Sequence, residues 1–227
     1  MSSSAPAQPG PGAPVRASTL TRLASLALSM LLASLGSSIA NVGLPSLAQA
    51  LGASFQQIQW VVLAYLLAIT ILVVGAGRLG DLKGRRRLLL AGTALFTLGT
   101  LLAGLASGLP WLVAARAVQG AGAALMMGLT LSFVGDTVAK EKTGSAMGLL
   151  GSMSAIGTAL GPSLGGWLIA GFGWRSIFLG LAPLGALALL VAWRSLPHDR
   201  PARRDAGPAV DIAGMLVLAG TLAAYTL

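Results

Sequence analysis

One arginine lies in a stretch of the sequence that is otherwise free of charge. Across residues 88–135 the only charged residue is Arg116, and a stretch of this length can form two membrane-spanning helices. An arginine at the centre of a membrane helix costs about 2.5–3.5 kcal/mol on insertion scales. Gln119 and Gly120 follow at i+3 and i+4, on the same helix face. Arg116 therefore either extends to the outer lipid headgroups or faces a polar cavity, where it would supply a fixed positive charge.

A second group combines glycines, an aspartate and a basic run. Residues 77–87 read GRLGDLKGRRR. The three glycines of this loop permit a tight turn with positive φ, and Asp81 can cap the helical turn that follows. The basic residues would hold the loop at the inner membrane surface. The loop either only anchors the topology or also takes part in function.

A third group is a run of small residues with one proline. Gly157, Gly161 and Gly165 are spaced four residues apart, and Gly166 follows directly. This spacing gives a smooth helix face against which another helix can pack closely. Pro162 removes one backbone hydrogen bond and favours a kink. Close packing alone and a functional role both fit this pattern.

The composition of the whole chain indicates where these groups must lie. Of 227 residues, 55% are hydrophobic and only 9% are charged, against about 25% charged in a soluble domain. So little charge cannot cover a soluble exterior, which excludes a soluble enzyme, a soluble binding module and a disordered protein. There is no cysteine, and the one histidine, His198, falls in a loop. We therefore expect no metal site, no Ser-His-Asp catalytic set and no enzyme activity.

The gaps between charged residues predict six membrane helices and the start of a seventh. The charge-poor stretches are residues 23–77 with a hairpin at 48–59, residues 88–135 with a turn at 107–110, and residues 143–174, 176–193 and 212–227. We expect an all-α integral membrane protein. Its parts would be a disordered cytoplasmic tail (1–20), a six-helix transmembrane bundle (21–195), a cytoplasmic loop (196–210) and an incomplete seventh transmembrane helix (211–227).

The net charge of +9 follows the expected topology. With the amino terminus inside, every Lys and Arg except Arg116 and Arg175 falls on an inner segment, and the outer loops hold Arg175 alone. The positive-inside rule describes this distribution. The positive charge would then face anionic lipid headgroups, so we expect no nucleic-acid partner.

Three motifs in the sequence resemble those of the major facilitator superfamily. The motif R-x-x-q-G-x-g-a-a begins at Arg116, and the motif g-x-x-x-G-P-x-x-G-G of its antiporter branches begins at Gly157. Weaker matches at residues 41–45, 59–68 and 210–214 resemble the 14-helix drug:proton antiporters of the EmrB/QacA type. The loop motif G-x-L-a-D-r-x-G-r-k/r matches at Gly77, Leu79, Asp81, Gly84, Arg85 and Arg86.

The resemblance implies the amino-terminal half of a transporter, a six-helix half-bundle built as two inverted three-helix repeats. It implies proton-coupled efflux of small hydrophobic compounds or drugs across the bacterial inner membrane, with the proton gradient as the energy source and no cofactor. Four sets of residues take roles by this resemblance. They are Arg116 and Gln119 for proton coupling; Gly77, Asp81, Gly84, Arg85 and Arg86 for a cytoplasmic latch; Gly157, Gly161, Pro162, Gly165 and Gly166 for antiporter packing; and Asn41, Trp60 and Tyr65 as candidates for lining the cavity.

One feature departs from that branch of the superfamily. Its members usually carry an aspartate in the first helix, where this chain reads LGSS at residues 35–38. Strongly cationic substrates are therefore not expected unless another half supplies a buried acid. Two alternatives stay open: a truncated half that does not transport, and a 12-helix uptake transporter for a sugar or metabolite. The expected partners are a small-molecule substrate, protons and membrane lipid, and transport would need a carboxy-terminal half or a second copy.

Overall fold

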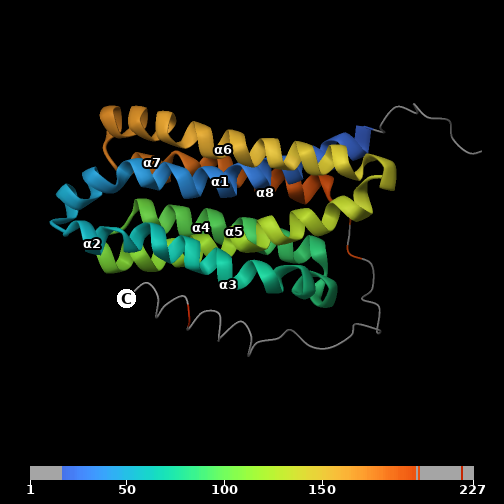
Figure 1. The fold of residues 1–227 in the computed structure, drawn as a ribbon, viewed down its shortest axis with the longest axis horizontal. Helices are drawn as coiled ribbons and strands as arrows, with labels where there is room; N and C mark the ends of the chain where they lie inside the picture. Colours follow the sequence, from blue (N-terminus) through green and yellow to red (C-terminus); the bar gives the residue numbers. More distant parts are fainter. Residues whose placement is uncertain (1–16, 198, 200–220, 222–227) are drawn as a thin grey trace, which may run out of the picture.

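Six helices in the structure are long and apolar enough to cross a membrane, as the sequence predicted. The computed structural model describes residues 17–197, Asp199 and Thr221, and this part of the chain forms an all-helical bundle (Figure 1). The predicted seventh helix and most of the predicted tail lie outside the described residues. The helices and short turns are α1 (Ala17–Leu51), α2 (Phe55–Ile58), α3 (Trp60–Lys83), α4 (Arg85–Gly104), α5 (Leu109–Thr137), η1 (Lys140–Lys142), α6 (Thr143–Phe172), α7 (Ser176–Leu179) and α8 (Leu181–Ser195).

The connection between α1 and α3 is shorter than the hairpin predicted for residues 48–59. Helix α1 continues to Leu51 and ends at Gly52, whose φ is 60°. Ser54 then starts α2 with a capping box, because its hydroxyl accepts from the Gln57 N–H while the Gln57 side chain accepts from the Ser54 N–H. The turn before α5 lies where the sequence predicted it, with Gly108 at the N-cap and a proline in the first turn.

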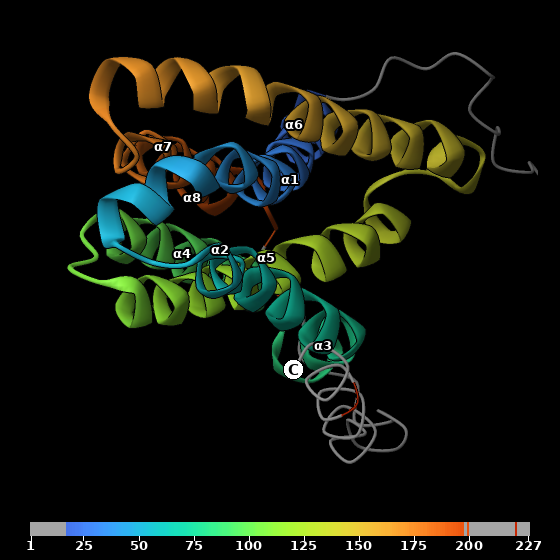
Figure 2. The same ribbon diagram turned by 60° about the vertical axis from the view of Figure 1, so that its left-hand side comes forward.

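The packing of the six long helices matches two inverted repeats. Helix α6 lies along α1, α5 packs between α3 and α4, and α8 packs on both α4 and α1 (Figures 1 and 2). Exchanging α1, α3 and α4 with α5, α6 and α8, in that order, turns each of these contacts into a contact of the same set, and the α4–α8 contact into itself. The α1–α6 contact becomes α5–α3, for example, and α4–α5 becomes α8–α1. This exchange is the relation that an inverted-topology repeat requires.

The charged residues divide between the two ends of the bundle. We call the end that carries the start of α1, the α3–α4 turn, η1 and the last turn of α8 the basic end (right in Figure 1). Among the described residues, all lysines and arginines except Arg116 and Arg175 belong to the segments at this end. The positive-inside rule would place the basic end in the cytoplasm.

Candidate functional site

Arg116 is fully buried in the bundle, on α5. Its Nε donates to the carbonyl oxygen of Val61 on α3 at 2.9 Å, and its Nη1 donates to that of Gly36 on α1 at 3.0 Å. Its side chain therefore joins three helices through carbonyl oxygens. These contacts place the guanidinium inside the bundle and not at the lipid headgroups.

Two aromatic rings enclose the Arg116 guanidinium. Its central carbon lies 4.1 Å from the centroid of the Tyr65 ring and 5.9 Å from that of Phe178. A cation over an aromatic face is stabilised by about 2 kcal/mol or more when both groups are desolvated. The Tyr65 hydroxyl donates to the carbonyl oxygen of Ala33 at 2.6 Å, which fixes the ring. Tyr65 was predicted to be a cavity-lining residue, and in this structure its fully buried side chain lies against Arg116.

A chain of hydrogen bonds runs from Arg116 to α4. Arg116 Nη1 donates to Gln119 Oε1 at 2.5 Å, and Gln119 Nε2 donates to the Thr100 hydroxyl at 2.8 Å. The Thr100 hydroxyl in turn donates to the carbonyl oxygen of Phe96 at 2.7 Å. The structure therefore brings together Arg116 and Gln119, the two residues that the sequence placed on one helix face. Sequence reasoning missed Thr100, because a threonine in an apolar helix carries no motif of its own.

The guanidinium has no negative partner among the residues that the structure describes. Arg116 Nη2 is buried and makes no hydrogen bond there, and Asp81 is paired with Arg85 at the basic end. A full positive charge is therefore held in an apolar environment by carbonyl dipoles, an amide and aromatic rings. Such a charge raises the cost of any second positive charge nearby and favours an anion or a deprotonated acid.

Glycines allow the helices to approach closely enough to build this site. A Cβ atom on Gly120 would lie 2.5 Å from the carbonyl oxygen of Tyr65, and one on Gly99 would lie 2.5 Å from the backbone nitrogen of Gln119. Both contacts are to backbone, which cannot rotate away. Gly120 therefore lets α5 lie directly against α3, and Gly99 lets α4 lie against α5 beside Gln119.

The predicted loop at residues 77–87 is mostly helical. Helix α3 continues through Gly77 and Gly80 to Lys83, and only Gly84 leaves the helix, with a φ of 96°. The prediction that Asp81 caps the following helix is wrong, because Asp81 lies within the end of α3. It pairs there with Arg85, whose Nη2 is 2.8 Å from Asp81 Oδ1.

The start of α4 is capped by Asp199, which the sequence analysis did not single out. Its carboxylate accepts from the N–H groups of Arg86 at 2.7 Å and Arg87 at 3.0 Å. This carboxylate satisfies backbone donors that the N-cap residue Gly84, having no side chain, leaves open. The signal available in the sequence was an acid just after Pro197 and a basic helix start without a capping side chain.

The arginines after Gly84 tie the turn to other helices. Arg85 Nη1 donates to the carbonyl oxygen of Ser132 on α5 at 3.1 Å. Arg86 donates to the carbonyl oxygens of Trp193 at 2.7 Å and Leu196 at 3.1 Å, at the end of α8. The residues predicted to form a latch thus connect α3, α4, α5 and α8 at the basic end, well separated along the helices from Arg116.

The predicted packing motif on α6 faces α1 with three of its five residues. Gly157, Gly161 and Gly165 are buried, and a Cβ on any of them would meet α1 at 3.0 Å or less. A Cβ on Gly166 would meet nothing within 4 Å, and Pro162 is exposed within a continuous helix.

The other two candidates for lining a cavity lie away from the arginine site. Asn41 is exposed on α1, and Trp60 is half-buried at the start of α3. Trp60 lines an apolar groove of about 490 Å³ at the end opposite the basic end, together with residues of the first turns of α5.

The fold is a six-helix bundle whose helix contacts match two inverted three-helix repeats, and the Arg116 side chain is buried between helices of both repeats. The chain matches the family model for the Major Facilitator Superfamily over residues 26–224, and it belongs to that superfamily.

The alignments with relatives and with solved structures cover most of the length of this chain. It is 33% identical over 194 residues to the riboflavin transporter RibZ of Clostridioides difficile, covering 86% of this chain and 42% of that protein. It is 36% identical over 200 residues to the multidrug resistance protein Stp of Mycobacterium tuberculosis, covering 87% and 36%. The xylose transporter XylE from E. coli, in a partially occluded inward-open conformation, has the same fold with a TM-score of 0.73, at 15% identity over 92% of this chain and 58% of that one. The chain thus spans about two-fifths of the length of these curated relatives.

Proposed function

We propose that the chain is the amino-terminal half of a proton-coupled exporter of small hydrophobic compounds. The observation that carries this proposal is the fully buried Arg116, which has an unpaired Nη2 and no carboxylate partner among the described residues. The antiporter motif on α6 and the multidrug resistance name of one relative support export as the direction. The relevant membrane is the bacterial cytoplasmic membrane, with the amino terminus and the basic end inside.

The proposed mechanism uses Arg116 as a fixed charge. Substrate enters between this half and a second half, and the two halves then rock to expose it outside. A proton that enters from outside neutralises an acid near the cavity. Because Arg116 disfavours a second positive charge, it lowers the proton affinity of that acid and helps to release the proton inside. The proton gradient is the energy source, and no cofactor is required.

The proposed substrates are neutral or weakly acidic hydrophobic molecules. In the spanning helices that the structure describes, no acidic residue lies in the middle, so a lipophilic cation would meet the charge of Arg116 without a counter-charge from these helices. A carboxylate in the second half would widen the range to cations, and the coupling acid would belong there as well.

Because the chain is much shorter than its relatives, we infer that transport needs a second half. This chain covers 36% to 42% of the two transporters described above and 58% of XylE. We expect the 227 residues alone to insert in the membrane without transport, unless two copies pair.

A second candidate is transport of an ordinary metabolite. One relative is named a riboflavin transporter, and the chain is 33% identical to it over 194 residues. The arginine site would serve either cargo, so the direction of transport and the compound separate the two candidates.

The test is efflux of a neutral fluorescent compound from cells that express the full-length protein. We expect the wild-type cells to expel it and a protonophore to stop expulsion. Arg116→Ala should abolish proton-dependent efflux at normal expression. Arg175→Ala removes an exposed arginine that donates to the carbonyl oxygen of Ala106 and does not contact Arg116, and it should leave more than half of the efflux. Undiminished efflux by Arg116→Ala would remove Arg116 from the mechanism, and accumulation of the compound would indicate uptake.

A further inference from the structure

Four basic residues flank Gly84. The side chains of two of them are bonded to other parts of the bundle, and the side chains of the other two make no such bond within the described residues. Arg85 is paired with Asp81 and donates to Ser132. The guanidinium of Arg86 is hydrogen-bonded to carbonyl oxygens at the end of α8. The side chains of Lys83 and Arg87 are exposed, and neither has an ion pair or hydrogen bond within the described part of the chain.

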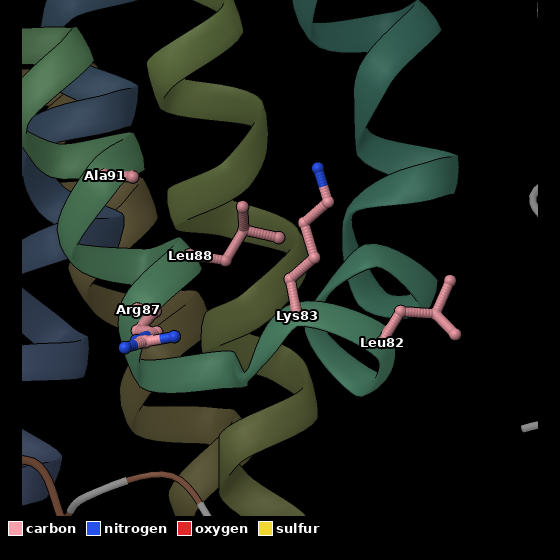
Figure 3. A pocket seen from close by; sticks show the side chains of 5 residues that line it. All are labelled: Leu82, Lys83, Arg87, Leu88 and Ala91. Carbon is pink, nitrogen blue, oxygen red and sulfur yellow. The ribbon is translucent and has the colours of Figure 1, made fainter. Parts of the chain in front are cut away.

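The two free cations line one groove. It has a volume of about 480 Å³ and lies where α3 ends and α4 begins. Lys83 comes from the last turn of α3 and Arg87 from the first turn of α4, and the rest of the lining is apolar, from Leu82, Leu88 and Ala91. Figure 3 shows the side chains of Lys83 and Leu88 directed into the space between the two helices.

This arrangement has the chemistry of a phospholipid with an anionic headgroup. The side chains of Lys83 and Arg87 form no ion pair with the described residues, while the nearby Asp199 carboxylate accepts from the backbone N–H of Arg87. The two side chains are therefore able to attract a phosphate at the membrane surface, and the apolar lining continues from them along α4. A water-soluble anion would use the charges and leave the apolar part of the groove uncovered. A neutral lipid would use the apolar part and leave both charges unpaired.

We propose that this groove binds one anionic phospholipid, with its phosphate between Lys83 and Arg87 and an acyl chain along Leu88 and Ala91. The site adjoins Gly84, the one residue that separates α3 from α4, so the bound lipid contacts both sides of the turn. The proposal does not depend on the transported compound or on proton coupling.

The test is native mass spectrometry of the full-length protein titrated with dioleoyl phosphatidylglycerol. Lys83→Gln with Arg87→Gln should weaken binding of the tightest lipid by about 10- to 30-fold, since each cation near the surface contributes about 1 kcal/mol and 1.4 kcal/mol is tenfold. The matched control is Lys140→Gln with Lys142→Gln, which removes the same charge from η1 at the same end. The control should keep the affinity within about twofold.

Two further measurements separate the sources of binding. Ala91→Trp keeps both cations and fills the groove, so it should weaken phosphatidylglycerol binding by at least about fivefold. Glycerophosphoglycerol, the soluble headgroup, should not compete at millimolar concentration. Equal loss in both double variants would mean that only overall charge matters, and competition by the soluble headgroup would mean a simple anion site. Either result would overturn the proposal, as would unchanged binding by the groove variants.

Discussion

The close contact between α1 and α6 can be tested by adding one methyl group at Gly161. A Cβ at this position would overlap Ser38 Oγ and would lie 2.8 Å from Ser38 Cβ and 2.9 Å from the backbone nitrogen of Ile39. Ser38 can turn away only by giving up its hydrogen bond to the carbonyl oxygen of Gly157. The backbone nitrogen cannot turn away at all, so α1 and α6 must separate.

The magnitude follows from two opposing terms. Overpacking a tight contact costs about 1–3 kcal/mol, and alanine in a helix gains up to about 1 kcal/mol over glycine. We expect Gly161→Ala to lose about 1–2 kcal/mol, which lowers Tm by about 2–8 °C for a domain of 150–250 residues. Gly166→Ala, in the same motif, meets nothing within 4 Å and should leave Tm unchanged or raise it by up to about 4 °C.

The assay is thermal unfolding of the purified protein in one detergent, with both variants side by side. Ser38→Gly combined with Gly161→Ala should recover part of the loss, because it removes two of the atoms that the new methyl group meets. The same shift in Gly161→Ala and Gly166→Ala would refute the packing argument. A fall in Tm that Ser38→Gly does not reduce would place the strain elsewhere.

Substitutions at three further positions, Gln119, Tyr65 and Gly84, test the arginine site and the turn at the basic end. Gln119→Glu should place a carboxylate beside Arg116, keep Tm equal or higher and abolish proton-dependent efflux; retained efflux would contradict the fixed-charge mechanism. Tyr65→Phe should lower stability by about 0.5–1.5 kcal/mol, through the lost hydrogen bond to Ala33, while Tyr65→Leu should lose about 2 kcal/mol more because the ring contact is lost as well; equal losses in thermal unfolding would contradict the ring's role. Gly84→Ala should cost about 1–3 kcal/mol, since its φ of 96° is strained for any side chain, whereas Gly135→Ala, which meets nothing within 4 Å, should not lower Tm.

Composition and the spacing of charges predicted the fold, because a chain with so few charged residues can form only membrane helices of a set length. Arg116 could be predicted as a special residue for the same reason: its charge is isolated in an apolar stretch. The sequence left two orientations open for it, and the hydrogen bonds to the carbonyl oxygens of Gly36 and Val61 hold the side chain inside the bundle, away from the lipid headgroups. Those acceptors are backbone atoms of distant segments and leave no trace in residue types.

The turn at residues 77–87 shows what local patterns leave undetermined. The three glycines predicted a tight turn with positive φ, and only Gly84 of the three adopts a positive φ. Gly77 and Gly80 lie within α3, because the reversal between α3 and α4 needs only one residue outside the helices. The capping acid proved to be Asp199, more than one hundred positions from the helix that it caps. Which acid reaches that helix start depends on the packing of α8 beside α4, a tertiary contact that no local motif encodes.

The orientation of the α6 motif was predictable only in part. Spacing of four residues indicated that Gly157, Gly161 and Gly165 share a face, and the structure adds that this face meets α1. Gly166 belongs to the motif by resemblance but lies off the contact, since it is one residue away from that stripe.

The most direct test of the account is the exchange of substrate for protons in everted membrane vesicles that contain the full-length protein. Vesicles energised to an acidic interior, with the gradient reported by acridine orange, should lose part of that gradient when a neutral hydrophobic substrate is added. Vesicles with Arg116→Ala should not respond. Substrate accumulation that continues after a protonophore collapses the gradient, or an unchanged response with Arg116→Ala, would contradict proton-coupled export through this arginine.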